Sequence, residues 1–460
     1  MKSRRLRVVY IACSKYDDEG YVLRFWRGVL PSNTLGCLKT LTEDLGRSHA
    51  LGPDVDLSVE VYDDTIQRVP VRKLARANRR RDTQVLVGLS GVQSNQFARA
   101  MDLALQFRAA GIQVMIGGFH VSGTLATFGE PTRELQRLLD HGVTLVKGEV
   151  EGPGVLEGIL RDALAGAMKP LYDITPPPDL ARAPITKPDR EYSRRFSGWN
   201  WATLDTSRGC PLNCSYCTII QVQGRRMRTR SPKCILEQVV RNLDEGTDHY
   251  FFTDDNFYRN PIWEELFDGL IALRKRGKGV QFMIQVDTKA YRNARFVEKA
   301  AAAGCMMVFT GMESVNPDNL KAANKNVNNP DEYARMVQTW RDAGVLVHGA
   351  YIIGFPFDTR ESLRRDIAVL RDQIKVDKVS FFMLTPLPGS RDYRKLIDDQ
   401  TPLDADLNNF DGLHEAFGHP RMAPGEWVAA HAEAWQTFYT KENIVDSLLR
   451  VPQQHYWQLF

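Results

Sequence analysis

Three closely spaced cysteines near the middle of the chain constrain its fold more than any other feature. Cys210, Cys214 and Cys217 follow the spacing C-x₃-C-x₂-C, and Tyr216 directly precedes the third cysteine. Such spacing lets one loop wrap three thiolates around a single metal centre. Thiolates are soft ligands that favour iron–sulfur clusters, zinc or copper(I). Three ligands rather than four indicate a cluster with one open iron, which is the position that catalysis needs.

A zinc site or a disulfide accounts for these cysteines less well. A zinc site usually has a fourth Cys or His close by, and Cys234 is the only nearby candidate. A disulfide with a spare thiol is disfavoured because the seven cysteines show no regular pairing pattern. An iron–sulfur cluster is therefore the favoured interpretation.

The motif resembles the signature of the radical S-adenosylmethionine (radical SAM) enzymes, both in its spacing and in the aromatic residue Tyr216. In that family the three cysteines hold a [4Fe–4S] cluster, and the methionine moiety of SAM chelates the fourth iron. One electron from the cluster cleaves the sulfonium and yields a 5′-deoxyadenosyl radical. The resemblance implies that Cys210, Cys214 and Cys217 are the metal ligands here.

Composition limits the class of protein. A chain of 460 residues is long enough for two or three domains, and 43% hydrophobic with 25% charged residues is ordinary for a globular protein. The net charge of +4 argues against a dedicated nucleic-acid binder. No apolar run reaches the length of about 18 residues that a transmembrane helix requires. The unpaired cysteines and the lack of a signal-peptide pattern predict a cytoplasmic protein.

The first third of the chain alternates strand and helix patterns, which is typical of a parallel, doubly wound α/β sheet. We expect this domain to cover residues 1–165, with its last strand at residues 143–147. Ligands of such sheets bind beyond the carboxyl ends of the strands. The predicted strands are residues 6–12, 55–62, 84–90, 112–116 and 143–147.

This layout resembles the cobalamin-binding, Rossmann-like domain that precedes many radical SAM cores. The resemblance implies cobalamin contacts at Ser90, at Gly117 and Gly118, and at Gly148, which all follow predicted strands. Glycine lets the backbone approach a ligand closely because it has no Cβ. The D-x-H-x-x-G motif, whose histidine ligates cobalt in methylcobalamin-dependent synthases, is absent from residues 63–68. A sheet domain that only packs on the core remains the alternative.

Prolines are dense between residues 170 and 188, which favours an extended segment without helix. We interpret residues 166–200 as a linker. Residues 201–400 then contain six strand–helix units, which predict a partial (β/α)₆ barrel of the TIM type with its active site at the carboxyl ends of the strands. A pattern change at Thr401 predicts a small helical cap over residues 401–460 that closes the barrel.

The ends of the predicted barrel strands carry the residues that the resemblance assigns to SAM. Strand ends at these places bind the amino group, the ribose and the adenine in the family, and carboxylates suit the ammonium and the ribose hydroxyls. The aspartates after the second strand could instead simply cap the next turn. The assigned residues are Asp254, Asp255, Gln285, Asp287, Glu313, Ser314 and Gly354.

Four arginines between residues 225 and 230 form a strong local concentration of positive charge. They belong either to a solvated loop or to a set of cations that stabilises an anionic substrate or the surroundings of the cluster. No catalytic side chain is singled out by the sequence.

The favoured function is cobalamin-dependent methyl transfer to an unactivated carbon of a small-molecule or natural-product substrate. The alternative is radical oxidation, cyclisation or rearrangement without methyl transfer, because the domain order also resembles an anaerobic cyclase. Such an enzyme needs an electron donor such as flavodoxin or ferredoxin. A methylthiotransferase is disfavoured because Cys13 and Cys37 are too few for a second cluster. A cofactor carrier with an inactive barrel is disfavoured by the intact cysteine motif.

Overall fold

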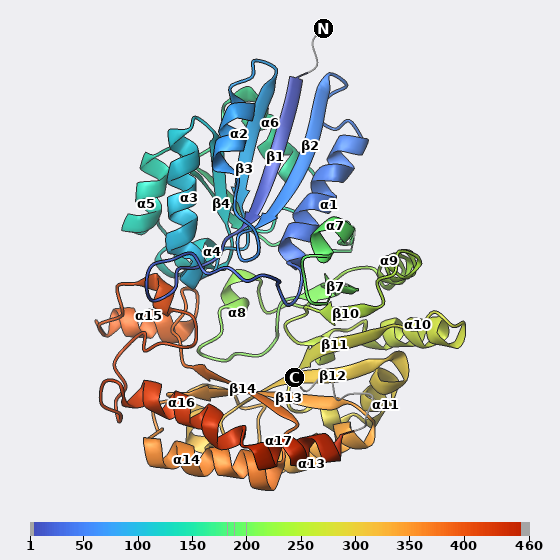
Figure 1. Cartoon of the computed structure of the whole chain (residues 1–460), viewed down its shortest axis with the longest axis vertical. Coiled ribbons are helices and arrows are strands. Elements are labelled where there is room, and N and C mark those ends of the chain that lie inside the picture. The colour runs from blue at the N-terminus through green and yellow to red at the C-terminus, as the bar shows by residue number, and fades with distance from the viewer. Residues whose placement is uncertain (1–3, 182, 188, 199, 452–460) are drawn as a thin grey trace.

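The computed structural model describes residues 4–181, 183–187, 189–198 and 200–451. It contains two six-stranded parallel sheets, one above the other in Figure 1, with the blue N-terminal strands pointing their carboxyl ends at the second sheet. This is the α/β architecture that the alternation of strands and helices predicts.

The N-terminal sheet has the strand order β2-β1-β3-β4-β5-β6, and all neighbouring strands are parallel. Parallel neighbours need crossover connections, which helices supply on both faces. Apolar residues of α2, α3 and α5 pack on one face, and those of α1 and α6 on the other. The strands are β1 (Arg4–Ala12), β2 (Val55–Asp63), β3 (Thr83–Leu89), β4 (Gln113–Gly117), β5 (Thr144–Gly148) and β6 (Leu171–Ile174); the helices are α1 (Asn33–Arg47), α2 (Val71–Asn78), α3 (Phe97–Ala109), α4 (Phe119–Phe128), α5 (Arg133–Asp140) and α6 (Val155–Ala165).

The sixth strand of this sheet corrects the prediction that residues 143–147 form the last one. β6 lies within the segment interpreted as a linker and pairs with β5, with Leu145 opposite Leu171. A strand between two prolines is tolerated here because it lies at the edge of the sheet, where one side needs no hydrogen-bond donors. The Pro170 carbonyl still accepts a hydrogen bond from the Leu145 N–H at 2.8 Å.

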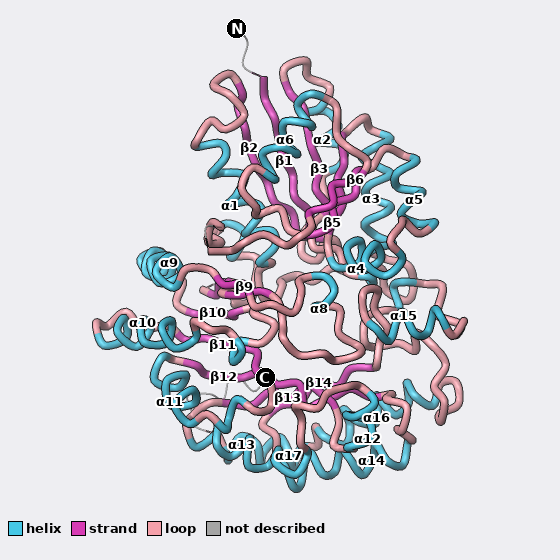
Figure 2. Tube along the Cα trace, turned by 180° about the vertical axis from the view of Figure 1, so that it is seen from behind, coloured by secondary structure: helices cyan, strands magenta, loops and turns pink. Residues whose placement is uncertain are grey.

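The second sheet has the order β14-β13-β12-β11-β10-β7, with every neighbouring pair parallel. Its helices cover the outer face, and the sheet curves as an open barrel (Figure 2). The strands are β7 (Trp201–Leu204), β10 (His249–Phe252), β11 (Gln281–Val286), β12 (Cys305–Glu313), β13 (Leu346–Ile353) and β14 (Lys378–Met383); the main outer helices are α9 (Pro232–Asp244), α10 (Trp263–Lys275), α11 (Ala294–Ala303), α13 (Tyr333–Asp342) and α14 (Arg360–Ala368).

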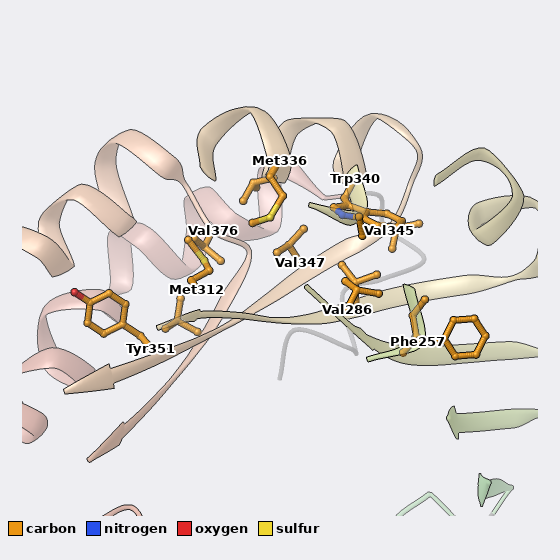
Figure 3. Packing of buried hydrophobic residues seen from close by; sticks show 14 of the residues in the cluster. Phe257, Val286, Met312, Met336, Trp340, Val345, Val347, Tyr351 and Val376 are labelled. Atoms are coloured by element: carbon orange, nitrogen blue, oxygen red, sulfur yellow. The ribbon is translucent and has the colours of Figure 1, made fainter. Parts of the chain in front are cut away.

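The largest apolar core lies between this curved sheet and its outer helices. Figure 3 shows Met336 and Trp340 of α13 above Val347 of β13. Trp340 is 1% exposed and Val347 is 0% exposed. Burying a side chain of this size contributes about 1.5–3 kcal/mol. The core therefore fixes the strand ends that carry the predicted site residues.

After α15 (Arg391–Asp398), the chain forms two C-terminal helices, α16 (Glu426–Phe438) and α17 (Lys441–Arg450). Phe438 and Trp435 of α16 pack on the ring of Phe381, which belongs to the core beneath the outer helices. Helix α16 therefore belongs to the outer helical layer, and the role of residues 401–460 in closing the barrel stays a prediction. In the described part of the chain, no helix has the length and apolarity needed to cross a membrane.

The two sheets are joined at both ends of the barrel sheet. At its first strand, Thr203 of β7 donates a hydrogen bond to the Pro31 carbonyl at 3.0 Å. Beyond its last strand, the Gly389 N–H donates to Thr127 of α4 at 2.8 Å. The N-terminal sheet therefore spans the barrel mouth.

Candidate cofactor sites between the two sheets

A cavity of about 350 Å³ lies where the carboxyl ends of the two sheets face each other. The N-terminal sheet lines it with all four residues predicted to contact cobalamin, Ser90, Gly117, Gly118 and Gly148. The barrel lines it with Asp205, Arg208, Thr253 and Asp255. One space thus adjoins both the sheet ends and the start of the cysteine loop.

Much of the cavity lining inside the N-terminal domain is apolar. Tyr10, Met115 and Val146 of the sheet and Leu156 of α6 line it. Apolar lining with a few convergent polar groups is typical of a small-molecule or cofactor site. The chemistry of this lining therefore suits a ligand with a flat apolar end and a polar rim, such as the nucleotide tail and the amide-bearing corrin of cobalamin.

The glycines at these strand ends have a packing role that the sequence did not reveal. A Cβ on Gly118, whose φ is +139°, would lie 2.6 Å from the carbonyl carbon of Gly91. A Cβ on Gly117 would lie 3.0 Å from the Val146 oxygen, and one on Gly148 would lie 2.6 Å from the Ile174 oxygen. Close approach between neighbouring protein segments therefore already requires glycine, whether or not a ligand is bound.

The loop after β2, where synthases of the related type carry a cobalt-ligating histidine, is occupied by internal contacts. Asp64 is 0% exposed and forms ion pairs with Arg24 at 2.6 Å and Arg99 at 2.7 Å. Asp63 accepts hydrogen bonds from Thr65 and from the Tyr192 hydroxyl at 3.0 Å. Both carboxylates therefore stabilise the loop itself.

The cysteine loop begins in a buried network of charges. Arg208 forms ion pairs with Glu149 at 2.9 Å, Glu151 at 2.5 Å and Asp205 at 2.9 Å. Burial lowers the pKa of the Arg208 guanidinium, but these carboxylates outweigh burial and raise the pKa well above its usual value. Arg230 adds a second cation against Asp205 at 3.0 Å. The network links the segment after β5 to the residue two positions before Cys210.

Further contacts fix the rest of the cysteine loop. Gly209 has a φ of +96°, and a Cβ there would lie 2.6 Å from the Arg226 oxygen. Ser215 exchanges two hydrogen bonds with Asp392 of α15, both at 3.0 Å. Asn324 donates to the Asn213 carbonyl at 2.7 Å. Asp392 and Asn324 are far apart in sequence, so two separate segments of the barrel hold the cysteine loop.

The three cysteines lie together on this loop as free thiols, with Cys214 buried and the other two partly exposed. Burial raises the pKa of the Cys210 thiol, and it raises the pKa of Cys217 to about 12; the neighbouring cysteines add to both effects. Among the described residues, no group of three or more His, Cys, Asp or Glu side chains could hold a metal ion as it stands. An iron–sulfur cluster spreads its thiolates over different irons, and the donor set fits that group.

Asp254 and Asp255 have different surroundings. The buried Asp254 carboxylate accepts hydrogen bonds from Thr206, at 2.6 Å, and from Ser207 and Asn260, at 2.5 and 3.1 Å. Its acceptor capacity is therefore used to hold the loop after β7. Asp255 instead lines the cavity and accepts the Gly209 N–H at 3.2 Å. Burial raises its pKa to about 7.

Gln285 of β11 and Asp287, which follows this strand, also have different surroundings. The Asp287 carboxylate is buried and pairs with Arg259 at 2.6 Å, and it accepts a hydrogen bond from Asn256 at 3.1 Å. Gln285 donates to the Asp254 carbonyl at 3.1 Å and is partly exposed. Gln285 is thus the more available of the two for a ligand.

Glu313 at the end of β12 contacts a lysine that the sequence pattern did not single out. Lys325 lies 2.9 Å from the Glu313 carboxylate, and both are nearly buried. Burial lowers the pKa of Lys325, but Glu313, Tyr216 and Cys214 raise it well above its usual value. No local sequence pattern marks Lys325, because its partner Glu313 lies on a different element. Ser314, which is 1% exposed, accepts the Asn316 N–H.

Gly354 follows β13 with a φ of +104°. Its N–H donates to the Asp358 carboxylate at 2.9 Å. The indole ring of Trp427 occupies the space where a Cβ would project, and its Nε1 donates to the Ile353 carbonyl at 3.0 Å. Glycine is required here by the tryptophan that packs against it.

The arginine-rich segment divides into two paired and two exposed residues. Arg228 pairs with Glu149 at 2.5 Å, and Arg230 is 1% exposed beside Asp205. Arg225 and Arg226 are exposed. The segment is therefore neither wholly a solvated loop nor wholly a set of cations around the site.

These features define a two-domain α/β protein in which an open barrel presents a three-cysteine loop to a Rossmann-type sheet. Residues 204–370 match the family description "Radical SAM superfamily". Over this region the chain is similar to radical SAM enzymes. The match begins at the end of β7 and includes all three cysteines.

Two curated relatives span most of the chain. Bacteriochlorophyllide d C-12(1)-methyltransferase of Chlorobaculum tepidum is 27% identical over 331 residues, which are 69% of this chain and 67% of the relative. Bacteriochlorophyllide d C-8(2)-methyltransferase of the same organism is 24% identical over 390 residues, which are 80% of this chain and 81% of the relative.

A solved structure shares the fold over nearly the whole length. The radical S-adenosylmethionine methyltransferase TsrM from Kitasatospora setae, with cobalamin and a [4Fe–4S] cluster bound, has a TM-score of 0.66 and 16% identity. The similarity covers 99% of this chain and 98% of TsrM. The sheet domain and the barrel therefore share one known two-domain arrangement.

Proposed function

We propose that this protein is a cobalamin-dependent radical SAM methyltransferase that acts on an unactivated carbon of a small molecule. The main observation in support of this proposal is the cavity that runs from the apolar interior of the N-terminal domain to Asp255 and Arg208, beside the cysteine loop. When bound, the cluster supplies the electron that cleaves SAM and cobalamin carries the methyl group. The chain's own residues bind and orient these groups.

Most of the predicted site residues have a proposed part in that task. Cys210, Cys214 and Cys217 would hold the cluster, and Glu313, paired with Lys325, would accept the ribose hydroxyls. Asp255 would accept from the SAM ammonium. We assign Asp254 and Asp287 positioning roles, because their carboxylates already have protein partners.

Ser90, Gly117, Gly118 and Gly148 would border the cobalamin. The strongest support for this part of the proposal is that all four line one cavity, although they come from three different strand ends. Positioning dominates the barrier in such a reaction, because the radical must lie close to the target C–H bond.

The proposal extends to the setting of the enzyme. All seven cysteines are free thiols, which supports work in a reducing compartment such as the cytoplasm. We propose flavodoxin or ferredoxin as the electron donor and a small molecule as the substrate.

Isotope labelling of SAM tests methyl transfer directly. Enzyme purified without oxygen and supplied with iron, sulfide and cobalamin is incubated with methyl-deuterated SAM and metabolites of a strain that lacks the gene. Visible spectra and iron counts confirm loading. A metabolite that gains one deuterated methyl group supports the proposal. Loss of hydrogens or unchanged mass in the converted metabolite overturns methyl transfer in favour of oxidation, cyclisation or rearrangement.

A further inference from the structure

A set of exposed cations lies around the cysteine loop without an assigned role. They come from two segments that are far apart in sequence, the turn before β9 (Arg228–Thr229) and helix α15. We call this set the cluster-side basic patch. Its members are Arg225, Arg226, Arg391, Arg394 and Lys395, which are all exposed.

Two of these arginines touch the cysteine loop itself. Arg225 donates to the Pro211 carbonyl at 3.0 Å, and the Arg391 guanidinium donates to the Asn213 carbonyl. Both carbonyls lie between Cys210 and Cys214 in the chain. The two guanidinium groups are therefore placed at the point where the metal-binding loop comes closest to solvent, since Pro211 is also exposed.

The helical period places more charge beside them. Arg391, Arg394 and Lys395 are spaced i, i+3 and i+4 on α15, so they share one face of that helix. Among the described residues, no ion pair neutralises any member of the patch, whereas the half-buried Arg228 and the buried Arg230 are both paired. The acids of the same helix are Asp392, which turns to Ser215, and Asp398 at the carboxyl end.

A radical SAM cluster needs one electron from outside the protein in each reductive cleavage, and electron transfer between proteins requires the two redox centres to lie close together. An unpaired basic surface also attracts an acidic partner and speeds encounter. We propose that the cluster-side basic patch is the docking surface for an acidic electron-carrier protein of the flavodoxin type. In the transfer, the reduced flavin loses one electron and the oxidised cluster gains it.

This inference rests on the proposed function, because only a redox-active cluster gives the patch a partner. Its test therefore measures binding as well as turnover. The cluster-loaded enzyme is titrated with flavodoxin by calorimetry at low and at high salt. The double variant Arg394→Glu/Lys395→Glu reverses two charges that make no contact with the cysteine loop.

A matched control reverses two charges elsewhere. Lys275 and Arg276 at the end of α10 are exposed and belong to no ion pair among the described residues. α10 follows β10 near one end of the barrel sheet and α15 follows β14 at the other. The variant Lys275→Glu/Arg276→Glu therefore has the same charge change away from the patch.

We expect the patch variant to raise the Kd for flavodoxin about tenfold or more at low salt, which corresponds to about 1.4 kcal/mol, and the control to leave it unchanged. Flavodoxin-driven formation of 5′-deoxyadenosine should fall in parallel, while cleavage driven by reduced methyl viologen should change less than about twofold.

Three results overturn the inference: an unchanged Kd in the patch variant, an equal loss in the control, or an equal loss of viologen-driven cleavage. Arg225→Glu/Arg391→Glu serves as the second variant, and it should weaken flavodoxin binding at least as strongly. If wild-type enzyme cleaves no SAM with any reductant, the proposed function fails, and the binding titration still decides whether the patch docks flavodoxin.

Discussion

Arg208 lies 2.9 Å from Glu149, although the two residues are separated by 59 positions in the chain. Glu149 directly follows β5 of the N-terminal sheet, and Arg208 directly precedes the glycine that opens the cysteine loop. Both side chains are nearly buried, with 13% and 12% of their surface exposed. One guanidinium therefore sets the position of the metal-binding loop relative to the neighbouring cavity.

Removing this guanidinium should destabilise the whole protein. Arg208→Ala leaves Glu149, Glu151 and Asp205 without their shared cation, and breaking a buried pair in this way costs about 3–5 kcal/mol. Urea denaturation of the apoprotein followed by circular dichroism measures the loss. Arg5→Ala is the control, because the Arg5–Asp56 pair is about half exposed and solvent screens such pairs, so its loss should be far smaller. Equal losses in the two variants would refute the structural role of Arg208.

Two glycine substitutions should have opposite effects on stability. Gly118→Ala forces a Cβ against the Gly91–Val92 backbone at a φ of +139°, so we expect poor folding or a loss of several kcal/mol. Gly158→Ala in α6 meets no atom within 4 Å and should stabilise by about 0.4–1 kcal/mol. Thermal unfolding measures both. A mild effect of Gly118→Ala would show that the loops can separate without penalty.

Asp358 should make stability depend on pH. Burial raises its pKa from the ordinary value of 3.8 to about 7, so the folded protein keeps this proton after the unfolded chain has released it. The stabilisation is fully present below pH 4 and is lost as pH rises to about 7, by at most about 1.4 kcal/mol per pH unit.

The variant Asp358→Asn tests this dependence. It should lower stability at acidic pH through its altered hydrogen bonds to Gly354 and Phe355, and its stability should fall less steeply between pH 4 and 7 than that of the wild type. Urea titrations at several pH values give the two slopes. Parallel slopes would mean that Asp358 titrates normally in the folded protein.

Cys214→Ala should remove the cluster without unfolding the protein. The variant is expected to lose the iron content and the visible absorption of a [4Fe–4S] cluster and all reductive SAM cleavage, because three thiolates are needed to hold it. Cobalamin retention reports on the N-terminal sheet and should not change. Cys234→Ala is the matched control, since Cys234 is exposed on α9, and it should keep full iron content.

The residue patterns predicted those elements whose formation depends on interactions within one segment of the chain. The alternation of strands and helices predicted both parallel sheets, and the cysteine spacing predicts a metal-binding loop. The strand β6 was missed because four residues between prolines carry too short a pattern, and only pairing with β5 makes them a strand. The sequence predicted helix α16 but not its packing on Phe381, because that packing is a tertiary contact.

The roles of individual side chains depended on distant partners. Nothing local distinguishes Arg228 from Arg225, yet Glu149 pairs with the first and leaves the second exposed. In the same way, Thr206 and Asn260 engage the carboxylate of Asp254 and not that of Asp255. Which of two neighbouring side chains forms the contact depends on the segments that meet in the folded protein. The sequence alone does not show this.

The hydrogen bonds of Thr203 and Gly389 attach the N-terminal domain to opposite ends of the barrel sheet. Because the N-terminal domain is attached at both ends, it cannot rotate away from the barrel about a single hinge without breaking one of these hydrogen bonds. We therefore expect the two domains to stay in contact throughout the catalytic cycle. Reactants should enter and products should leave through the side of the interface that lies between these two contacts.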